Sequence, residues 1–180
     1  MLTNSSPWEN LKFDPEGVDE IRRKFFGTLY NTYGFFALYA NVDGWNPDPL
    51  TSNLSPLTSF TEIDKWVLSK LNSLIKEVTA AYEAYEPTKA GRAISDFVQD
   101  DLSNWYVRLN RKRFWGGEMD ADKQAAYYTL YTCLKTVAQL MAPNAPFYGD
   151  RLYRDLTDET VHLSTWPVAD EAMINLELER

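Results

Sequence analysis

The sequence predicts an all-α protein, an antiparallel bundle of about five helices. Three observations support this fold class. Apolar residues recur at steps of three and four along most of the 180-residue chain, which is the spacing of amphipathic helices. Proline and glycine interrupt these apolar stripes at intervals, as expected for the connections between helices. A sustained alternation of apolar and polar residues, which would indicate a strand, is absent.

The first helix is predicted from residue 14 to about residue 41. Asp14 suits the N-cap and Pro15 suits the first helical position. Each of Gly27 and Gly34 weakens a helix by up to about 1 kcal/mol relative to alanine. We therefore expect these two glycines to let a neighbouring helix approach closely.

The second helix follows a loop at 43–58 that contains three prolines. Ser59-Phe60-Thr61-Glu62 fits the pattern of a capping box, in which Ser59 bonds the backbone three residues on and Glu62 reaches back. We predict a helix from this box to about residue 85. Its inward stripe consists of Ile63, Trp66, Val67, Leu71, Leu74, Ile75, Val78 and Tyr82.

Three further helices are predicted in the C-terminal half. Pro87 opens the third helix, which ends near Gly116 and Gly117. Asp120 is placed to cap a fourth helix, and a short fifth helix covers about 145–156. Because the connections are short, antiparallel neighbours in one domain are expected. The inward positions of the third helix are Ala90, Ala93, Ile94, Phe97, Val98, Trp105 and Leu109.

The composition is that of a globular protein, with 44% hydrophobic and 24% charged residues. No apolar run approaches the roughly 20 residues that cross a bilayer. The N-terminal stretch has neither the basic nor the apolar region of a secretory signal. Cys133 is the one cysteine, so an internal disulfide is excluded. A cytoplasmic protein without membrane association is expected.

The third helix carries the most informative polar segment. Four of the 18 basic residues fall within six positions, at Arg108, Arg111, Lys112 and Arg113. The first three differ by three or four positions and share one helical face, whereas Arg113 points elsewhere. Such a face can follow a line of phosphates, and Trp115 at the end of the helix can stack on an unpaired base.

From these residues alone two explanations stay open. Basic residues in the last turns of a helix are favoured by its dipole, so a solvated helix end is the commoner case. RNA binding is the second explanation. The net charge of −8 argues against a nucleic-acid binder, although net charge is a sum and a docking face is local.

No catalytic or metal-binding set is recognisable. His162 is the one histidine and Cys133 the one cysteine, which is too few for a zinc site built from these types. The adjacent carboxylates Asp100 and Asp101 point about 100° apart on a helix and do not form an acid–base pair. Neither a glycine-rich phosphate loop nor a nucleophile in a recognisable context occurs. The residues therefore indicate binding rather than catalysis.

Five phrases in the same order resemble the isoleucyl-tRNA synthetases, a family of class I aminoacyl-tRNA synthetases. They are NSSPWENLKF at 4–13, RRKFFGTLYNTY at 22–33, DKWVLSKLN at 64–72, DLSNWYVRLNRKRFW at 101–115, and MAP, PF and LY within 141–153. The resemblance covers about residues 4 to 167. The catalytic His-Ile-Gly-His and Lys-Met-Ser-Lys-Ser signatures of that family are absent.

The resemblance implies a fragment of a larger ligase, its anticodon-binding domain. Residues 1–13 would be the remnant of the connection from the catalytic domain, 14–167 the helical bundle, and 168–180 the start of a C-terminal extension. It further implies that ATP belongs to a missing catalytic domain, and that this segment needs no cofactor and no metal. The implied partners are an isoleucine tRNA and the other domains of one polypeptide, in a monomer.

In this interpretation the bundle grips the anticodon stem and loop. Four basic residues contact phosphate, and one amide and one indole lie near bases. This set comprises Arg108, Arg111, Lys112 and Arg113, with Asn104 and Trp115. The alternative from another class is a helical protein-interaction or scaffold module without RNA binding, which predicts an exposed apolar patch.

Two positions depart from the family pattern. Gly149-Asp150-Arg151 stands where the family more often has small and acidic residues, and Trp166 replaces a usual phenylalanine before Pro167. We expect both departures to affect packing near the fifth helix more than RNA contact.

Overall fold

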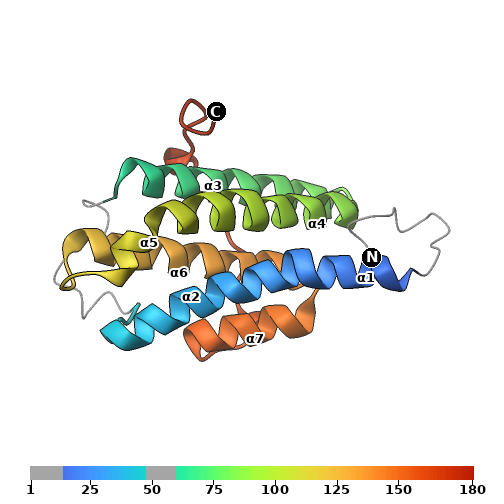
Figure 1. Cartoon of the computed structure of the whole chain (residues 1–180). Coiled ribbons are helices and arrows are strands. Elements are labelled where there is room, and N and C mark those ends of the chain that lie inside the picture. The colour runs from blue at the N-terminus through green and yellow to red at the C-terminus, as the bar shows by residue number, and fades with distance from the viewer. Residues whose placement is uncertain (1–13, 48–59) are drawn as a thin grey trace.

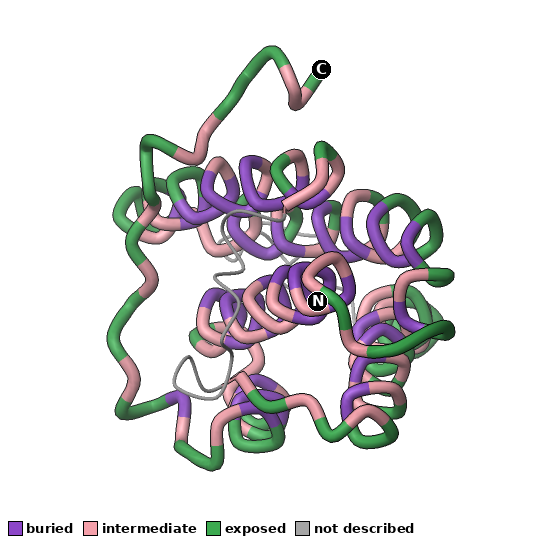
Figure 2. Tube along the Cα trace, turned by 90° about the vertical axis from the view of Figure 1, so that its left-hand side faces the viewer, coloured by how far each residue is buried: buried purple, intermediate pink, exposed green. Residues whose placement is uncertain are grey.

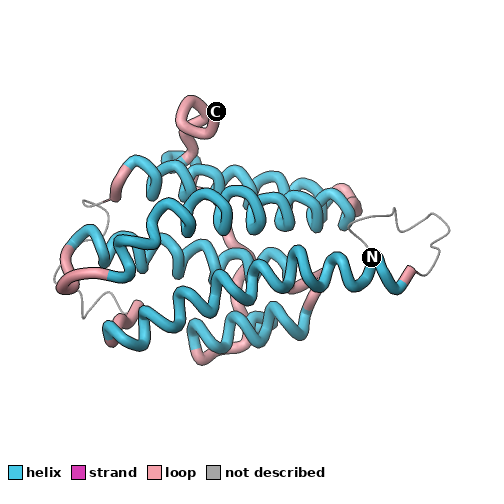
Figure 3. The backbone as a smooth tube through the Cα atoms, viewed as in Figure 1, coloured by secondary structure: helices cyan, strands magenta, loops and turns pink. Residues whose placement is uncertain are grey.

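The computed structural model describes residues 14–47 and 60–180, which form a bundle of five helical rods (Figure 1). Within these residues there is no strand (Figure 3). The predicted all-α bundle is therefore confirmed. The rods are α1 (Pro15–Ile21) continuing through the π-helical segment η1 (Arg22–Phe26) into α2 (Gly27–Asp43); α3 (Glu62–Glu83); α4 (Pro87–Asp96) continuing through the π-helical η3 (Phe97–Val107) into α5 (Arg108–Trp115); α6 (Ala121–Met141); and α7 (Pro146–Thr157).

Most helix ends lie where the local chemistry predicts them. Asp14 accepts a hydrogen bond from the backbone N–H of Glu16 at 3.1 Å and caps α1. Proline occupies the first positions of α1, α4 and α7, where its missing N–H has no helical partner to lose. Gly44 ends α2 with a left-handed φ of 61°, which glycine adopts without steric cost.

The start of the second helix differs from the prediction. Thr61 caps α3: its hydroxyl accepts from the backbone N–H of Asp64, and the Asp64 carboxylate accepts from the backbone N–H of Thr61 at 2.9 Å. The capping box is therefore Thr61–Asp64 and not Ser59–Glu62. Ser59 lies outside the described residues, and so does the part of the predicted loop from 48 to 58. Both quartets satisfy the same pattern, and only the second has its carboxylate buried.

The helix α6 lies at the centre of the bundle and packs against α2, α3, α5 and α7 (Figure 1). Its apolar side chains are buried from Ala125 to Met141, and Cys133 is fully buried among them. In Figure 2 the buried stretches of the helices turn toward one another and the exposed stretches turn outward. Each large apolar side chain enclosed in this way stabilises the fold by about 1.5–3 kcal/mol.

Close helix approach occurs at a different glycine from those predicted. A Cβ added at Gly34 would meet nothing within 4 Å, and one at Gly27 would meet only the carbonyl of Arg22 at 3.5 Å. A Cβ at Gly149 would lie 3.1 Å from the carbonyl oxygen of Ala138 on α6. The departure at Gly149 therefore affects packing between α7 and α6, as expected.

Beyond α7 the chain turns back across the bundle and ends beside α3 (Figure 2). The indole N–H of Trp166 donates to the Thr79 hydroxyl of α3 at 2.8 Å, and Trp166 also lines a small cleft with Pro146, the first residue of α7. Two 3₁₀ turns, η4 (Val161–Leu163) and η5 (Glu171–Met173), lie in this segment. The predicted domain limit at residue 167 stays a prediction. The chain beyond this limit contacts α3, because the backbone N–H of Asn175 donates to the Ser69 hydroxyl at 2.7 Å.

Candidate nucleic-acid interface on the third helix

The third rod (α4, η3 and α5) buries every fourth residue over most of its length, and this spacing determines which of its side chains are exposed. An α-helix turns 100° per residue, so a stripe at every fourth position drifts by about 40° per step. The hydrogen bonds of η3 span five residues and widen the turn, which keeps the stripe directed inward. The buried stripe is Ile94, Val98, Leu102, Tyr106, Asn110 and Phe114.

Two residues predicted to point inward are therefore exposed. Trp105 is 59% exposed and Leu109 is 58% exposed. The prediction assumed a spacing of 3.6 residues per turn, which the π-helical turns do not follow. The signal that sequence reasoning missed was the strict four-residue spacing of the apolar positions.

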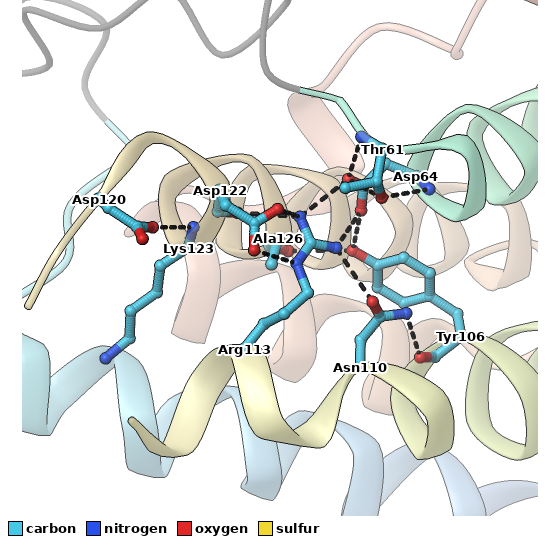
Figure 4. Close-up of polar contacts among 9 residues, drawn as sticks. All are labelled: Thr61, Asp64, Tyr106, Asn110, Arg113, Asp120, Asp122, Lys123 and Ala126. Atoms are coloured by element: carbon cyan, nitrogen blue, oxygen red, sulfur yellow. Dashed lines mark hydrogen bonds and ion pairs between the residues drawn. The ribbon is translucent and has the colours of Figure 1, made fainter. Parts of the chain in front are cut away.

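Arg113 points into the bundle, as Figure 4 shows, and all five of its N–H donors have partners. Nη1 and Nη2 donate to the two carboxylate oxygens of Asp64 at 2.8 and 2.9 Å. The remaining donors bond Asn110 Oδ1 at 3.0 Å, the Asp122 carboxylate at 3.0 Å and the Asp122 carbonyl at 2.9 Å. The arginine thus joins α5 to the start of α3 and to the first turn of α6.

The Asp64 carboxylate is fully buried and accepts five hydrogen bonds. Besides Arg113 and the Thr61 backbone, the donors are the hydroxyls of Thr61 at 2.7 Å and Tyr106 at 2.7 Å. Burial alone would raise the pKa of this carboxyl, but the bonds from Arg113, Tyr106 and Thr61 outweigh burial and hold the pKa below its ordinary value. Asp64 is therefore a charged acceptor at neutral pH.

This polar cluster gives Arg113 a structural role. Its side chain is only 13% exposed, and a phosphate would have to displace a bidentate carboxylate partner. The predicted phosphate contact through Arg113 is therefore not retained. The prediction that Arg113 points away from its three basic neighbours is confirmed.

The other five predicted residues are all exposed on η3 and α5. These five residues follow one side of the rod, because successive members are separated by four, three, one and three positions. They are Asn104, Arg108, Arg111, Lys112 and Trp115. Trp115, the last residue of the helix, is 56% exposed. We call this set the basic face.

Within the described part of the chain, the three cations of the basic face form no ion pair, in contrast to four cations on η1 and α7. Arg22 pairs with Asp19 at 2.6 Å, and Lys24 with Glu20 at 2.6 Å. On α7, Arg151 pairs with Asp155 at 2.9 Å and Arg154 with Asp150 at 2.7 Å. Positive charge that its own helix does not neutralise is thus concentrated on α5.

His162 and Cys133, the other residues considered as candidates, are not placed for catalysis or metal binding. His162 is exposed in η4, and burial raises the pKa of the Cys133 thiol far above its ordinary value. A group of three or more histidine, cysteine or acidic side chains placed to hold a metal ion is not found in residues 14–47 and 60–180. In the same residues no helix is long and apolar enough to span a membrane.

Fold and face together define an all-α binding domain with a local cationic surface on one helix. Residues 64–180 match the family model described as the anticodon-binding domain of tRNA ligase. This match covers more than half of the chain, and the chain belongs to that family.

Full-length relatives agree with this assignment. The chain is 64% identical to the isoleucine–tRNA ligase of Bacteroides thetaiotaomicron over 99% of its own length and 16% of the relative's. The isoleucine–tRNA ligase of Porphyromonas gingivalis is 61% identical over 100% of this chain and 16% of its own. That of Clostridium tetani is 46% identical over 99% and 17%. The chain therefore spans about a sixth of the length of these relatives.

Proposed function

We propose that this chain is the tRNA-binding helical domain of an isoleucine–tRNA ligase and grips the anticodon stem and loop. Arg108, Arg111 and Lys112 contact backbone phosphates, and Asn104 and Trp115 lie near bases. Joining isoleucine to tRNA with ATP belongs to other parts of a longer polypeptide, because the family's catalytic signatures do not occur in these 180 residues.

The observation that carries this proposal is the concentration of unpaired cations on the basic face. A cation already held by a carboxylate four residues away has little to gain from a phosphate. Arg108, Arg111 and Lys112 have no such partner among the described residues, and all three are exposed. Neutralising phosphates releases condensed counterions, which supplies much of the affinity for nucleic acid.

The acidic net charge of −8 is compatible with this function. Some of the acidic residues lie on other rods, where they pair with cations of the same rod, as Asp19 and Glu20 do on the first rod and Asp150 and Asp155 do on α7. An RNA backbone responds mainly to charge within about 10 Å of it at moderate salt. A local cationic face therefore attracts phosphate even on an acidic protein.

The salt dependence of binding tests the proposal. The Arg108→Ala, Arg111→Ala, Lys112→Ala triple variant is titrated with isoleucine tRNA at several salt concentrations, beside the unaltered chain. Each lost phosphate contact lowers the slope of log affinity against log salt by about 0.7–0.9. We expect a slope reduced by about 2 to 3 in total.

The matched control removes three cations that their own helices already pair. The Lys24→Ala, Arg151→Ala, Arg154→Ala variant has the same change in net charge. Its salt slope should stay close to that of the unaltered chain. Equal slopes for both triple variants would show that net charge, and not the basic face, governs binding.

We further propose that the domain works in the cytoplasm, in a monomer, attached to the other domains of its ligase. The alternative of a protein-interaction module predicts no tRNA affinity. Titration of the chain with isoleucine tRNA and with a random RNA of equal length at low salt separates the two. Binding to neither RNA would reject the proposed function.

A further inference from the structure

The chain forms a cleft of about 490 Å³ between the start of α3, the exposed side of η3 and α5, and the C-terminal tail. Its apolar lining consists of Ile63, Trp66, Trp105, Leu109 and Leu178. The two indole rings lie with centroids 6.4 Å apart at an interplanar angle of 53°. Trp105 is 59% exposed, so much of its surface remains accessible.

We propose that this cleft takes an unpaired RNA base, which stacks on Trp105. The inference rests on the proposed function and adds to it a stacking residue outside the predicted set. Aromatic side chains serve this purpose in proteins that bind single-stranded nucleic acid, because every base has a π-face.

The position of the cleft beside the basic face supports RNA as its occupant. The cleft residues Trp105 and Leu109 lie beside two cations of the basic face, Arg108 and Lys112. Along the rod these four residues are separated by three, one and three positions, so they share one side of it. A strand whose phosphates follow Arg108 and Lys112 would bring its bases within reach of the indole. In single-stranded loops the bases are free to turn outward in this way.

The charges in the cleft suit a base and not a phosphate. Glu62, Asp101 and Glu179 line the cleft, together with Lys70 and Arg180. Lys70 already lies 3.8 Å from the Asp101 carboxylate, and Ser73 donates to Glu179 at 2.9 Å. Carboxylates repel phosphate but accept hydrogen bonds from the N–H groups on a base edge. We therefore expect the backbone to stay outside on the basic face.

The test is a cycle that pairs loss of the indole with loss of the base. The RNA probes are the anticodon stem-loop of an isoleucine tRNA and the same hairpin with abasic residues throughout its loop. Trp105→Ala should weaken binding of the intact hairpin by roughly 5- to 150-fold, the range of a single aromatic–base stack. The abasic hairpin should bind the unaltered chain and Trp105→Ala equally. Trp105→Phe should retain most of the affinity for the intact hairpin.

Phe147→Ala is the control, because Phe147 is 91% exposed on α7 and does not line the cleft. It should not change affinity for either hairpin. Far-UV circular dichroism and urea unfolding establish that each variant is folded. Undiminished binding of the intact hairpin by Trp105→Ala overturns the proposal and leaves the cleft to a protein partner. An equal loss with both hairpins also overturns it. Failure of the unaltered chain to bind either hairpin would instead reject the proposed function.

Discussion

Replacement of Arg113 by alanine should destabilise the bundle far more than replacement of its neighbour Arg111. Arg113 is the cation that joins α5 to the fully buried Asp64 carboxylate on α3, whereas Arg111 is exposed. Both residues are basic, on the same helix and two positions apart. The two substitutions should therefore differ in their effect on the free energy of unfolding only because the two side chains lie on different sides of the rod.

The magnitude follows from what remains when the guanidinium is removed. Breaking a buried ion pair costs about 3–5 kcal/mol, because it leaves a buried charge uncompensated. Asp64 keeps three of its five donors, two from Thr61 and one from Tyr106, so the lower end applies. We expect Arg113→Ala to lower the free energy of unfolding by about 3 kcal/mol. For a domain of this size, that lowers the melting temperature by about 6–12 °C.

The assay is urea unfolding at pH 7, followed by far-UV circular dichroism. Arg113→Ala should shift the midpoint without changing the slope of the transition. Arg111→Ala should stay within about 0.5 kcal/mol of the unaltered chain. The Asp64→Asn, Arg113→Met double variant should be more stable than the sum of the two single changes predicts, because it removes both charges. If Arg113→Ala were as stable as Arg111→Ala, the structural role would be wrong and Arg113 would return to the candidate phosphate contacts.

Three further results are expected. Hydrogen bonds from Thr160 and Arg154 lower the pKa of Asp150 to about 2 from an ordinary 3.8. A depressed folded-state pKa contributes its full stabilisation above the unfolded value, and this contribution is lost as pH falls toward the folded value. In urea unfolding, the stability advantage of the unaltered chain over Asp150→Asn should therefore shrink as pH falls below 3.8 and be gone at about 2. Gly149→Ala should destabilise the chain by about 1–3 kcal/mol, since its Cβ would press on α6. Gly34→Ala has open space around the new Cβ and should stabilise the chain by about 0.5–1 kcal/mol. Equal effects of the two substitutions on the free energy of unfolding would contradict the packing. The buried Cys133 thiol should not react with a thiol reagent until the chain unfolds, and rapid reaction in the folded state would contradict its burial.

The five helices could be predicted because their ends depend on local chemistry. Pro15, Pro87 and Pro146 begin helices and Gly44 ends one, and each acts through its own backbone. The capping box at Thr61 was missed because its neighbour quartet fits the same pattern, and the choice depends on a partner outside the helix. That partner is Arg113, 49 residues away along the chain.

The candidate site could be predicted only in part, for the same reason. Arg108, Arg111 and Lys112 are exposed as the helical spacing indicated. The role of Arg113 depends on Asp64 and Asp122, whose distance from it is a property of the packed bundle. Trp105 was placed inward because a regular α-helix was assumed, and the π-helical turns of η3 place it outside.

The most direct test of the proposed interface is hydroxyl-radical footprinting of the chain with and without the anticodon stem-loop of an isoleucine tRNA. Oxidation reports the solvent accessibility of individual aromatic side chains. Trp105 and Trp115 are 59% and 56% exposed in the free chain, and RNA on the third helix should protect both. Phe147, which is 91% exposed on α7, should react at the same rate with and without RNA. Protection of Phe147 with unchanged oxidation of both tryptophans would contradict the interface proposed on the third helix.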